Sequence, residues 1–275
     1  MEKFLNLGCG ARICSDPRWV HVDFVSSHNR VIGHNLLEGI PFPDASFDVV
    51  YSSHVLEHFR REDGSRFVRE CCRVIRSGGT LRVAVPDLEQ VCRLYLSALE
   101  RIRAGEDAYR NRYDWMMLEM YDQAVRTRPG GEMGEYLARK DLPDREFILS
   151  RIGGTGRDII DDAPTWVRPC GERRGACKEP GGRRSWREWK RTLFLDRGER
   201  EAIDLGRFRL GGEVHQWMYD EYSLGRLLRE SGFGEVRRCD AADSRIPRWG
   251  TFFLDTDTDG TEHAPNSVYM EAVRS

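Results

Sequence analysis

The segment that most constrains the fold is "LNLGCGARICSDPRWVHVDF" at residues 5–24, in which a glycine turn separates two short apolar runs. Short runs rich in β-branched or apolar residues and bounded by Gly, Pro, Asp or Ser are typical of strands. Gly8 and Gly10 tolerate the positive φ angles of a tight turn and let a ligand approach the backbone. Asp23 lies at the end of the second run. The segment therefore predicts two strands joined by a turn that can hold a ligand.

Further runs of the same kind extend this pattern along the first third of the chain. The predicted strands cover residues 3–7, 19–24, 47–52 and 80–85. Between the last two, apolar residues at helical spacing over 55–75 predict a helix, interrupted near 63–64 and ended by the glycines at 78–79. Strands that alternate with helices predict an α/β fold with a parallel, doubly wound sheet.

The pattern changes after Pro86. Residues 88–128 are charged and amphipathic and predict long helix, whereas 129–212 show little periodicity and predict an unusually long irregular connection. Residues 220–232 predict a helix capped by an Asp and stopped by a Gly, followed by a strand near Val236. Residues 250–273 predict a final hairpin with an Asp-Gly turn.

Composition and charge limit the class of protein. The 275 residues suit one large domain or one domain with a long insertion. Lys and Arg number 43 against 45 for Asp and Glu, so no global field favours a polyanion and we expect no nucleic-acid partner. Eight cysteines without a C-x-x-C spacing predict reduced thiols. Without an apolar run of about 20 residues or a signal segment, we expect a cytoplasmic protein outside the membrane.

The glycine turn excludes two common phosphate-binding patterns. A dinucleotide fingerprint needs a third Gly where this chain has Ile13, with its acid further along than Asp23. The Lys and Ser or Thr of a Walker loop are also missing. A ligand without phosphates fits better, with an amino acid end on the turn and ribose hydroxyls on the carboxylate. The alternative is an ordinary turn followed by a solvated strand end.

Four stretches in order, "LNLGCG", "HVDF", "NLLEGIPFPDASFDVVYSSHVLEH" and "CCRVIRSGGTLRVAVPD", resemble the motifs of class I S-adenosylmethionine-dependent methyltransferases of type 11. The resemblance covers residues 3 to about 90 and again roughly 215 to 273, and it implies a Rossmann-like, doubly wound sheet of seven strands with an antiparallel last strand. Residues 1–90 are then the cofactor-binding half and 215–275 the C-terminal part of the same domain. Residues 91–214 carry no such resemblance, and we expect them to be a long helical and irregular insertion after strand five that forms a substrate lid.

The resemblance implies one set of contacts to S-adenosylmethionine. They are Leu7, Gly8, Cys9 and Gly10 at the methionine end together with Ser52 and Ser53, Asp23 at the ribose hydroxyls, and Asn35 and Leu36 at the adenine. The chain departs from the family at Asn6 and Asn35, where relatives often carry acids. The stretch at 11–18 is also too short for the usual first helix.

Three histidines are the candidate catalytic residues. Methyl transfer requires alignment of a nucleophile and, for some acceptors, removal of its proton, and histidine is the side chain that titrates near neutrality. His54 is the first candidate because it follows a strand at the carboxyl edge of the sheet, where open α/β sheets bind ligands. His58 could equally be a packing residue and His215 a helix-start anchor, and proximity alone could suffice. We expect no metal.

The insertion is expected to choose the acceptor. Residues 168–200 combine excess Lys and Arg with Trp186 and Trp189, which would suit an anionic or aromatic small molecule. The same segment could be a solvated loop or could meet single-stranded RNA. The sequence thus predicts a methyltransferase for a small-molecule acceptor, at oxygen rather than nitrogen, in secondary-metabolite or sugar tailoring. The alternatives are a non-catalytic, regulatory S-adenosylmethionine-binding protein and an RNA-directed methyltransferase, and the oligomeric state is left open.

Overall fold

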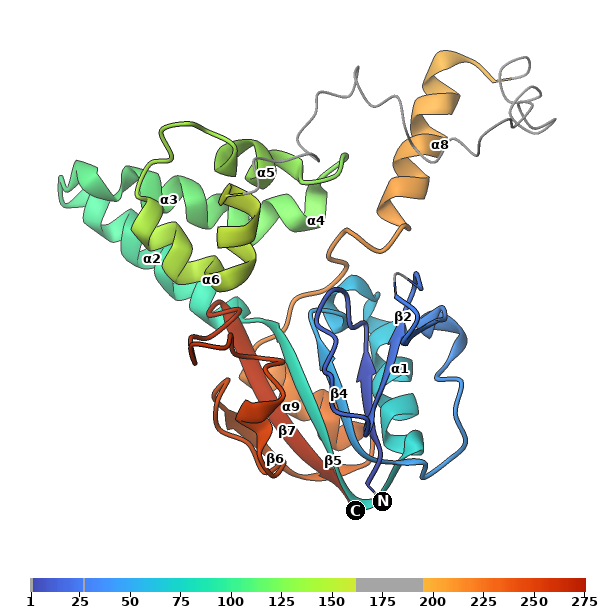
Figure 1. Cartoon of the computed structure of the whole chain (residues 1–275). Helices are drawn as coiled ribbons and strands as arrows, with labels where there is room; N and C mark the ends of the chain where they lie inside the picture. Colours follow the sequence, from blue (N-terminus) through green and yellow to red (C-terminus); the bar gives the residue numbers. More distant parts are fainter. Residues whose placement is uncertain (1, 27, 162–194) are drawn as a thin grey trace.

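The computed structural model describes residues 2–26, 28–161 and 195–275, and its centre is a seven-stranded sheet in the order β3-β2-β1-β4-β5-β7-β6 (Figure 1). The strands are β1 Phe4–Leu7, β2 Trp19–Asp23, β3 Val31–Gly33, β4 Phe47–Ser53, β5 Ile75–Pro86, β6 Phe233–Cys239 and β7 Ser267–Arg274. The strand β7 runs antiparallel to both of its neighbours, β5 and β6. The predicted α/β fold with an antiparallel last strand is confirmed.

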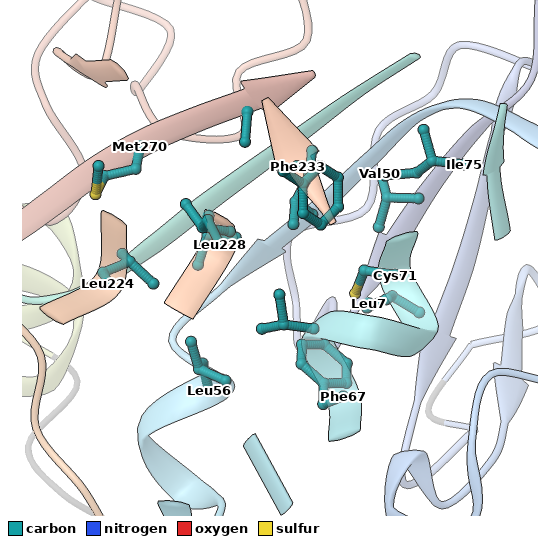
Figure 2. Packing of buried hydrophobic residues seen from close by; sticks show 14 of the residues in the cluster. Leu7, Val50, Leu56, Phe67, Cys71, Ile75, Leu224, Leu228, Phe233 and Met270 are labelled. Carbon is teal, nitrogen blue, oxygen red and sulfur yellow. The ribbon is translucent and has the colours of Figure 1, made fainter. Parts of the chain in front are cut away.

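Two amphipathic helices cover one face of the sheet. These are α1 Arg61–Val74 and α9 Glu221–Glu230, which contact each other and the strands beneath them. Their apolar sides join the strands in one core, in which Phe67, Leu224 and Leu228 are almost completely buried (Figure 2). Burial of each such side chain contributes about 1.5–3 kcal/mol. This layer fixes the strands whose ends form the site.

The other face of the central strands is covered by irregular segments. Alternate residues of β1, β2 and β4 meet the segment around 246–254 in a second core of mainly aromatic side chains. Its buried members are Phe4, Cys14, Trp19, Val49, Tyr51, Ile246, Trp249, Phe252 and Leu254. Buried Asn6 secures the stretch at 11–18, since it donates to the Arg12 carbonyl at 3.0 Å and lies 3.3 Å from His21 Nδ1. The stretch at 11–18 contains no helix, as its length predicts.

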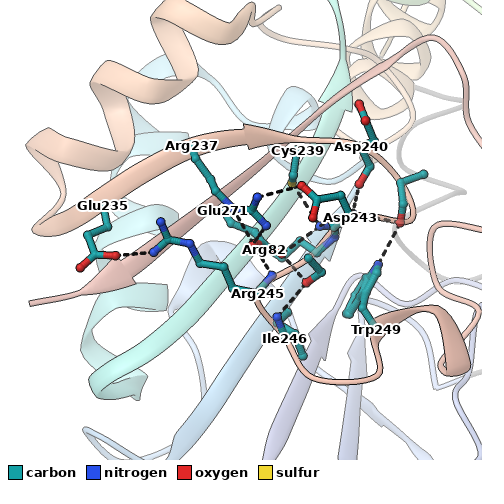
Figure 3. Close-up of polar contacts among 12 residues, drawn as sticks. Arg82, Glu235, Arg237, Cys239, Asp240, Asp243, Arg245, Ile246, Trp249 and Glu271 are labelled. Atoms are coloured by element: carbon teal, nitrogen blue, oxygen red, sulfur yellow. Dashed lines mark hydrogen bonds and ion pairs between the residues drawn. The ribbon is translucent and has the colours of Figure 1, made fainter.

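A buried ion cluster ties the segment after β6 to the middle of the sheet. Arg82 on β5 is completely buried, and its Nε lies 2.6 Å from Asp255. Its Nη1 lies 2.9 Å from Glu271 on β7 (Figure 3). Its guanidinium also donates to the backbone carbonyls of Asp240 and Asp243. Every charge in the cluster therefore has an opposite charge or a hydrogen-bond partner, which burial demands.

The described parts of the insertion after β5 are largely helical. The helices are α2 Leu88–Arg103, α3 Arg110–Met117, α4 Gln123–Val125, α5 Gly131–Leu137, α6 Arg145–Asp161 and α8 Arg197–Arg209, with short 3₁₀ and π turns at Asp107–Tyr109 and Leu118–Asp122. Helices α2, α3, α5 and α6 share a core, whereas α8 has no buried residue and takes no part in it. The core includes buried Trp115, Met116 and Ile148. The expectation of irregular chain over 129–212 is wrong for the described parts, because α5, α6 and α8 lie there. The basic segment's two tryptophans lie outside the described residues.

The predicted bounds of the first helix and the predicted final hairpin are also wrong. The predicted helix over 55–75 begins as a 3₁₀ turn, Leu56–His58, before α1 starts at Arg61, and α1 runs through 63–64 without interruption. Ile75 is the first residue of β5, not the end of the helix. The final hairpin does not form, because β7 pairs with β5 and β6. Before it, only an isolated bridge joins Thr256 to Glu262.

Two further observations concern the predicted environment. Among the described residues, all of the cysteines are free, and Cys170 and Cys177 lie outside them. In the same part of the chain, each helix is too short or too polar to cross a bilayer.

Candidate functional site

A pocket of about 530 Å³ opens at the carboxyl ends of β1, β2 and β4. The chain order reverses here, because β1 has β2 on one side and β4 on the other. Ligands of open α/β sheets bind in this crevice, and the volume lies in the range of roughly 300–1,000 Å³ of small-molecule sites. The lining residues are Gly8, Gly10, Asp23, Phe24, His34, Asn35, Leu36, Leu37, His54, Val55, His58, Phe59, Arg60, Asp63, Arg209, Leu210, Gly211, Gly212 and Gln216.

The glycine turn forms one wall of the pocket. Gly8 has a φ of +68°, and a Cβ at this position would overlap the Cγ2 methyl of Val55. Gly10 also has a positive φ, of +51°, but no atom lies near the position of its Cβ. Gly8 is therefore required by both backbone conformation and space, and Gly10 by conformation alone.

Asp23 lies at the end of β2, beside the turn. Its Oδ2 accepts a hydrogen bond of 2.7 Å from the Gly10 amide. Because a carboxylate offers about four lone-pair sites, this bond leaves capacity for the two hydroxyls of a ribose. The side chain also lines the pocket, as the ribose assignment requires.

Apolar side chains beyond Asp23 supply a surface for a flat ring. Phe24 and Leu37 line the pocket and are 68% and 52% exposed. Asn35 caps the turn η1 Leu36–Glu38 by accepting from the Leu37 amide at 3.1 Å, so its oxygen has one free lone pair for an adenine amino group. Phe24 and Leu37 are absent from the residues predicted from the sequence. The sequence does indicate Phe24, because this aromatic residue directly follows Asp23.

Four predicted cofactor residues contribute no side chain to this lining. Leu7 is completely buried in the main core, and Cys9 is buried with Sγ 3.7 Å from the Gly10 carbonyl. Burial raises the pKa of the Cys9 thiol to about 11, so the thiol stays protonated. Ser52 and Ser53 end β4 outside the lining, and the Ser52 hydroxyl is buried without a hydrogen-bond partner in the described chain.

His54 is held between two groups directly after β4. Its φ of +54° is rare for a residue with a Cβ, and such strain is concentrated at functional sites. Its Nδ1 lies 3.2 Å from Glu57 Oε1, and its Nε2 lies 2.9 Å from the Ser267 hydroxyl. Burial by itself lowers the pKa of His54, but contact with the Glu57 carboxylate outweighs it and raises the pKa.

Glu57 brings the three predicted histidines together. Burial by itself raises the pKa of this fully buried carboxyl, but contact with His54 and the charge of that imidazole outweigh burial and lower the pKa to about 2. The rings of His58 and His215 meet edge to face with centroids 4.8 Å apart. Burial lowers the pKa of His215 to about 3, so its imidazole is neutral. Glu57 is absent from the residues predicted from the sequence. The His-x-x-Glu-His spacing of residues 54–58 could have indicated it, because this spacing puts a carboxylate close to two imidazoles.

The insertion reaches the mouth of the pocket at the end of α8. Residues 209–212 line the mouth, and Arg209 donates to the Ala124 carbonyl at 3.1 Å. The Gln216 side chain donates to the Arg209 carbonyl at 3.0 Å. Arg60 and Arg209 place positive charge on this rim, and Asp63 places one negative charge there.

The strand order is that of a Rossmann-like α/β protein with a small-molecule pocket at its carboxyl edge, and part of the sequence is similar to known proteins. Residues 21–83 match the family "Methyltransferase domain". The chain is 51% identical over 57 residues to "Probable S-adenosylmethionine-dependent methyltransferase Rv3030" of Mycobacterium tuberculosis, which is 21% of this chain and 20% of that protein. It is 45% identical over 42 residues to the ajmaline N-methyltransferase of Rauvolfia serpentina, and these residues are 15% of this chain and 14% of that protein. The resemblance to class I S-adenosylmethionine-dependent methyltransferases is confirmed.

The matched part is limited in extent. The chain covers about a fifth of the length of the mycobacterial relative. Among solved structures, "PigF with SAH" aligns with all of this chain and 56% of its own at 9% identity and a TM-score of 0.37. The 1,6-didemethyltoxoflavin-N1-methyltransferase of Burkholderia thailandensis aligns with 30% of this chain and 44% of its own at 17% identity and a TM-score of 0.25. The assignment of the fold therefore depends on the strand order of this chain.

Proposed function

We propose that this protein transfers a methyl group from S-adenosylmethionine to a small-molecule acceptor bound at the His54 end of the pocket. The observation that carries the proposal is the joining, in one cavity, of the Gly8 turn, the Asp23 carboxylate and two histidines. The family match and the relatives support the same cofactor and the same class of enzyme.

The residues present fit this cofactor. Gly8 lines the pocket and has no side chain, so a ligand can approach its backbone. We assign the ribose hydroxyls to Asp23 and the adenine to the surface of Phe24, Leu36 and Leu37, with Asn35 at its amino group. When bound there, S-adenosylmethionine supplies a methyl group already activated on its sulfonium. The cofactor roles of Leu7, Cys9, Ser52 and Ser53 would be limited to backbone contacts or support of the wall.

His54 is the proposed general base. Glu57 beside Nδ1 favours the tautomer that leaves the Nε2 lone pair available, as a carboxylate does for a catalytic histidine. In the structure, Nε2 meets the Ser267 hydroxyl. An acceptor hydroxyl that takes the place of the Ser267 hydroxyl as the partner of Nε2 would give its proton to this nitrogen. The oxygen acceptor and a role in secondary-metabolite or sugar tailoring remain part of the proposal.

The proposed acceptor is small and carries a negative or aromatic group, because the pocket is closed on one side by residues 209–212 and bordered by Arg60 and Arg209. We propose that the insertion, 91–214, acts as the substrate lid through this contact. The cofactor half at 1–90 and the C-terminal part at 215–275 then supply the floor and walls.

A methyl-transfer assay with labelled cofactor and a panel of hydroxylated acids, sugars and aromatics tests the proposal. We expect transfer to at least one acceptor, with turnover reduced at least about tenfold in His54→Ala and cofactor affinity retained. His34→Ala is the matched control, because His34 lines the pocket but bonds the Gly39 carbonyl on the adenine side. Tight cofactor binding without transfer to any acceptor would instead support the regulatory alternative, and transfer only to RNA would contradict the small-molecule assignment.

A further inference from the structure

Atoms with unused hydrogen-bonding capacity meet behind the His54 end of the pocket. The Oε2 of Glu57 and the Nδ1 of His58 are buried without a hydrogen bond to any described residue, and the buried Oε1 of Glu57 has only its contact of 3.2 Å with His54 Nδ1. A buried polar atom left without a partner costs about 1–3 kcal/mol, and a charged one more. Such atoms on adjacent residues indicate that a further ligand completes the cluster.

The geometry of the cluster suits a metal ion. One ligand atom each from Glu57, His58 and His215 lie within 4.8 Å of one another. In a formed zinc site, with bonds of about 2.0–2.2 Å, ligand atoms stand roughly 3–4 Å apart. Two imidazoles and one carboxylate favour zinc, iron or cobalt over magnesium or calcium, which prefer oxygen ligands alone.

We propose that Glu57, His58 and His215 bind one first-row divalent cation, of the Zn²⁺ type, at the base of the pocket. The cation takes the place of the hydrogen bonds that Glu57 and His58 lack. The positive charge of the cation also compensates the fully buried Glu57 carboxylate, which burial demands.

Backbone contacts hold the ligands together before the ion binds. Glu57 and His58 follow β4, whereas His215 returns from the insertion. The Glu57 carbonyl accepts from the Gln216 amide at 2.7 Å, and the His215 amide donates to the Gln123 carbonyl at 2.9 Å. His54 contacts Glu57 and is itself held by Ser267, an arrangement in which an outer residue orients a ligand.

Three protein ligands leave coordination positions for another molecule. His58 lines the pocket, so an open position can face the acceptor. If methyl transfer occurs as proposed above, on which this step rests, an acceptor hydroxyl bound to the cation would lose its proton to His54 more easily. The acceptor class would then be a molecule with a metal-binding hydroxyl, such as one with a neighbouring oxygen for chelation.

Cobalt titration tests the site independently of methyl transfer. The full chain, freed of metal with a chelator that is then removed, is titrated with Co²⁺ and followed by visible absorption. We expect one tightly bound ion per chain, with d–d bands but no thiolate charge-transfer band, since the proposed ligands contain no sulfur. His58→Gln and His215→Ala should each weaken binding by at least about 100-fold, more than the loss of an outer residue.

The controls separate loss of the site from loss of the fold. His28→Ala removes an exposed histidine elsewhere and should bind Co²⁺ as the wild type does. Thermal melting in chelator should be similar for wild type and His58→Gln, and added Zn²⁺ should raise the melting temperature of the wild type only. No binding by the wild type, thiolate bands, or equal binding by the variants would overturn the metal site. Because S-adenosylmethionine affinity is measured separately, failure here leaves the methyl-transfer proposal intact.

Discussion

At the scale of single residues, the site depends on positions where the chain accepts unusual backbone geometry. Gly8 and His54 both have positive φ angles, and both lie at the carboxyl edge of the central strands. Sequence patterns predicted the first because glycine marks such turns. The second could be placed after a strand, but its conformation could not be predicted, because its environment includes Ser267 on β7, far along the chain.

Replacement of Gly8 by Ala should destabilise the fold and the cofactor wall together. We expect a loss of about 3 kcal/mol in the free energy of unfolding, from the left-handed backbone and the overlap with Val55. Gly10→Ala is the matched control and should lose only about 1 kcal/mol, because space around its Cβ is open. Urea denaturation measures both, and the double variant Gly8→Ala/Val55→Ala should recover part of the loss. Equal losses in the two single variants would contradict the steric account.

Phe24→Ala should weaken cofactor binding without weakening the fold. An exposed ring that packs on adenine contributes roughly 1–1.5 kcal/mol, so we expect a dissociation constant raised about tenfold by calorimetry. Tyr222→Ala removes an equally exposed ring on α9, away from the pocket, and should leave the affinity unchanged. An unchanged affinity in Phe24→Ala would remove this residue from the adenine site.

At the scale of elements, strands were predicted more successfully than connections. The runs that became β1, β2 and β4 are apolar on both faces, which short-range patterns reveal. The predicted final hairpin does not form. The apolar residues at 250–257 suggested a strand, but Phe252 and Leu254 instead fill the second core. Helix α6 escaped prediction because Gly153 kinks it, with a φ of +55°, and interrupts the apolar period.

The buried cluster on β5 and β7 should govern acid stability. Burial by itself raises the pKa of Glu271, but hydrogen bonds from Ser244 and Arg245 and the charges of Arg237 and Arg82 lower it below its usual 4.5. A lowered pKa means that this contribution to stability is present above about pH 4.5 and is lost as the pH falls through the folded-state pKa.

Glu271→Gln should therefore cost about 3–5 kcal/mol at neutral pH, because it leaves Arg82 partly uncompensated in the core. The difference from wild type should shrink as the pH falls below 4.5, which denaturation at several pH values measures. Glu89→Gln breaks an exposed pair with Arg93 within α2 and should cost less than about 0.5 kcal/mol at any pH. A constant difference at all pH values would contradict the assignment of the pKa.

At the scale of the whole molecule, a nearly neutral chain is divided between a sheet with a pocket at its carboxyl edge and a helical insertion that borders this pocket. The order of motifs predicted the fold and the position of Asp23, since each motif lies at a strand end. The Glu57, His58 and His215 cluster could not be derived in this way. His215 stands far from the other two in sequence and meets them only through the return of the chain from the insertion.

The most direct test of the central claim is calorimetric titration of S-adenosylmethionine into the wild type, Asp23→Ala and Asp107→Ala. Asp107 is an exposed acid of the insertion and serves as the control. We predict one site per wild-type chain, an affinity weakened more than about tenfold in Asp23→Ala through loss of charged hydrogen bonds, and no change in Asp107→Ala. Absence of binding to the wild type, or an equal dissociation constant for folded Asp23→Ala, would contradict the account.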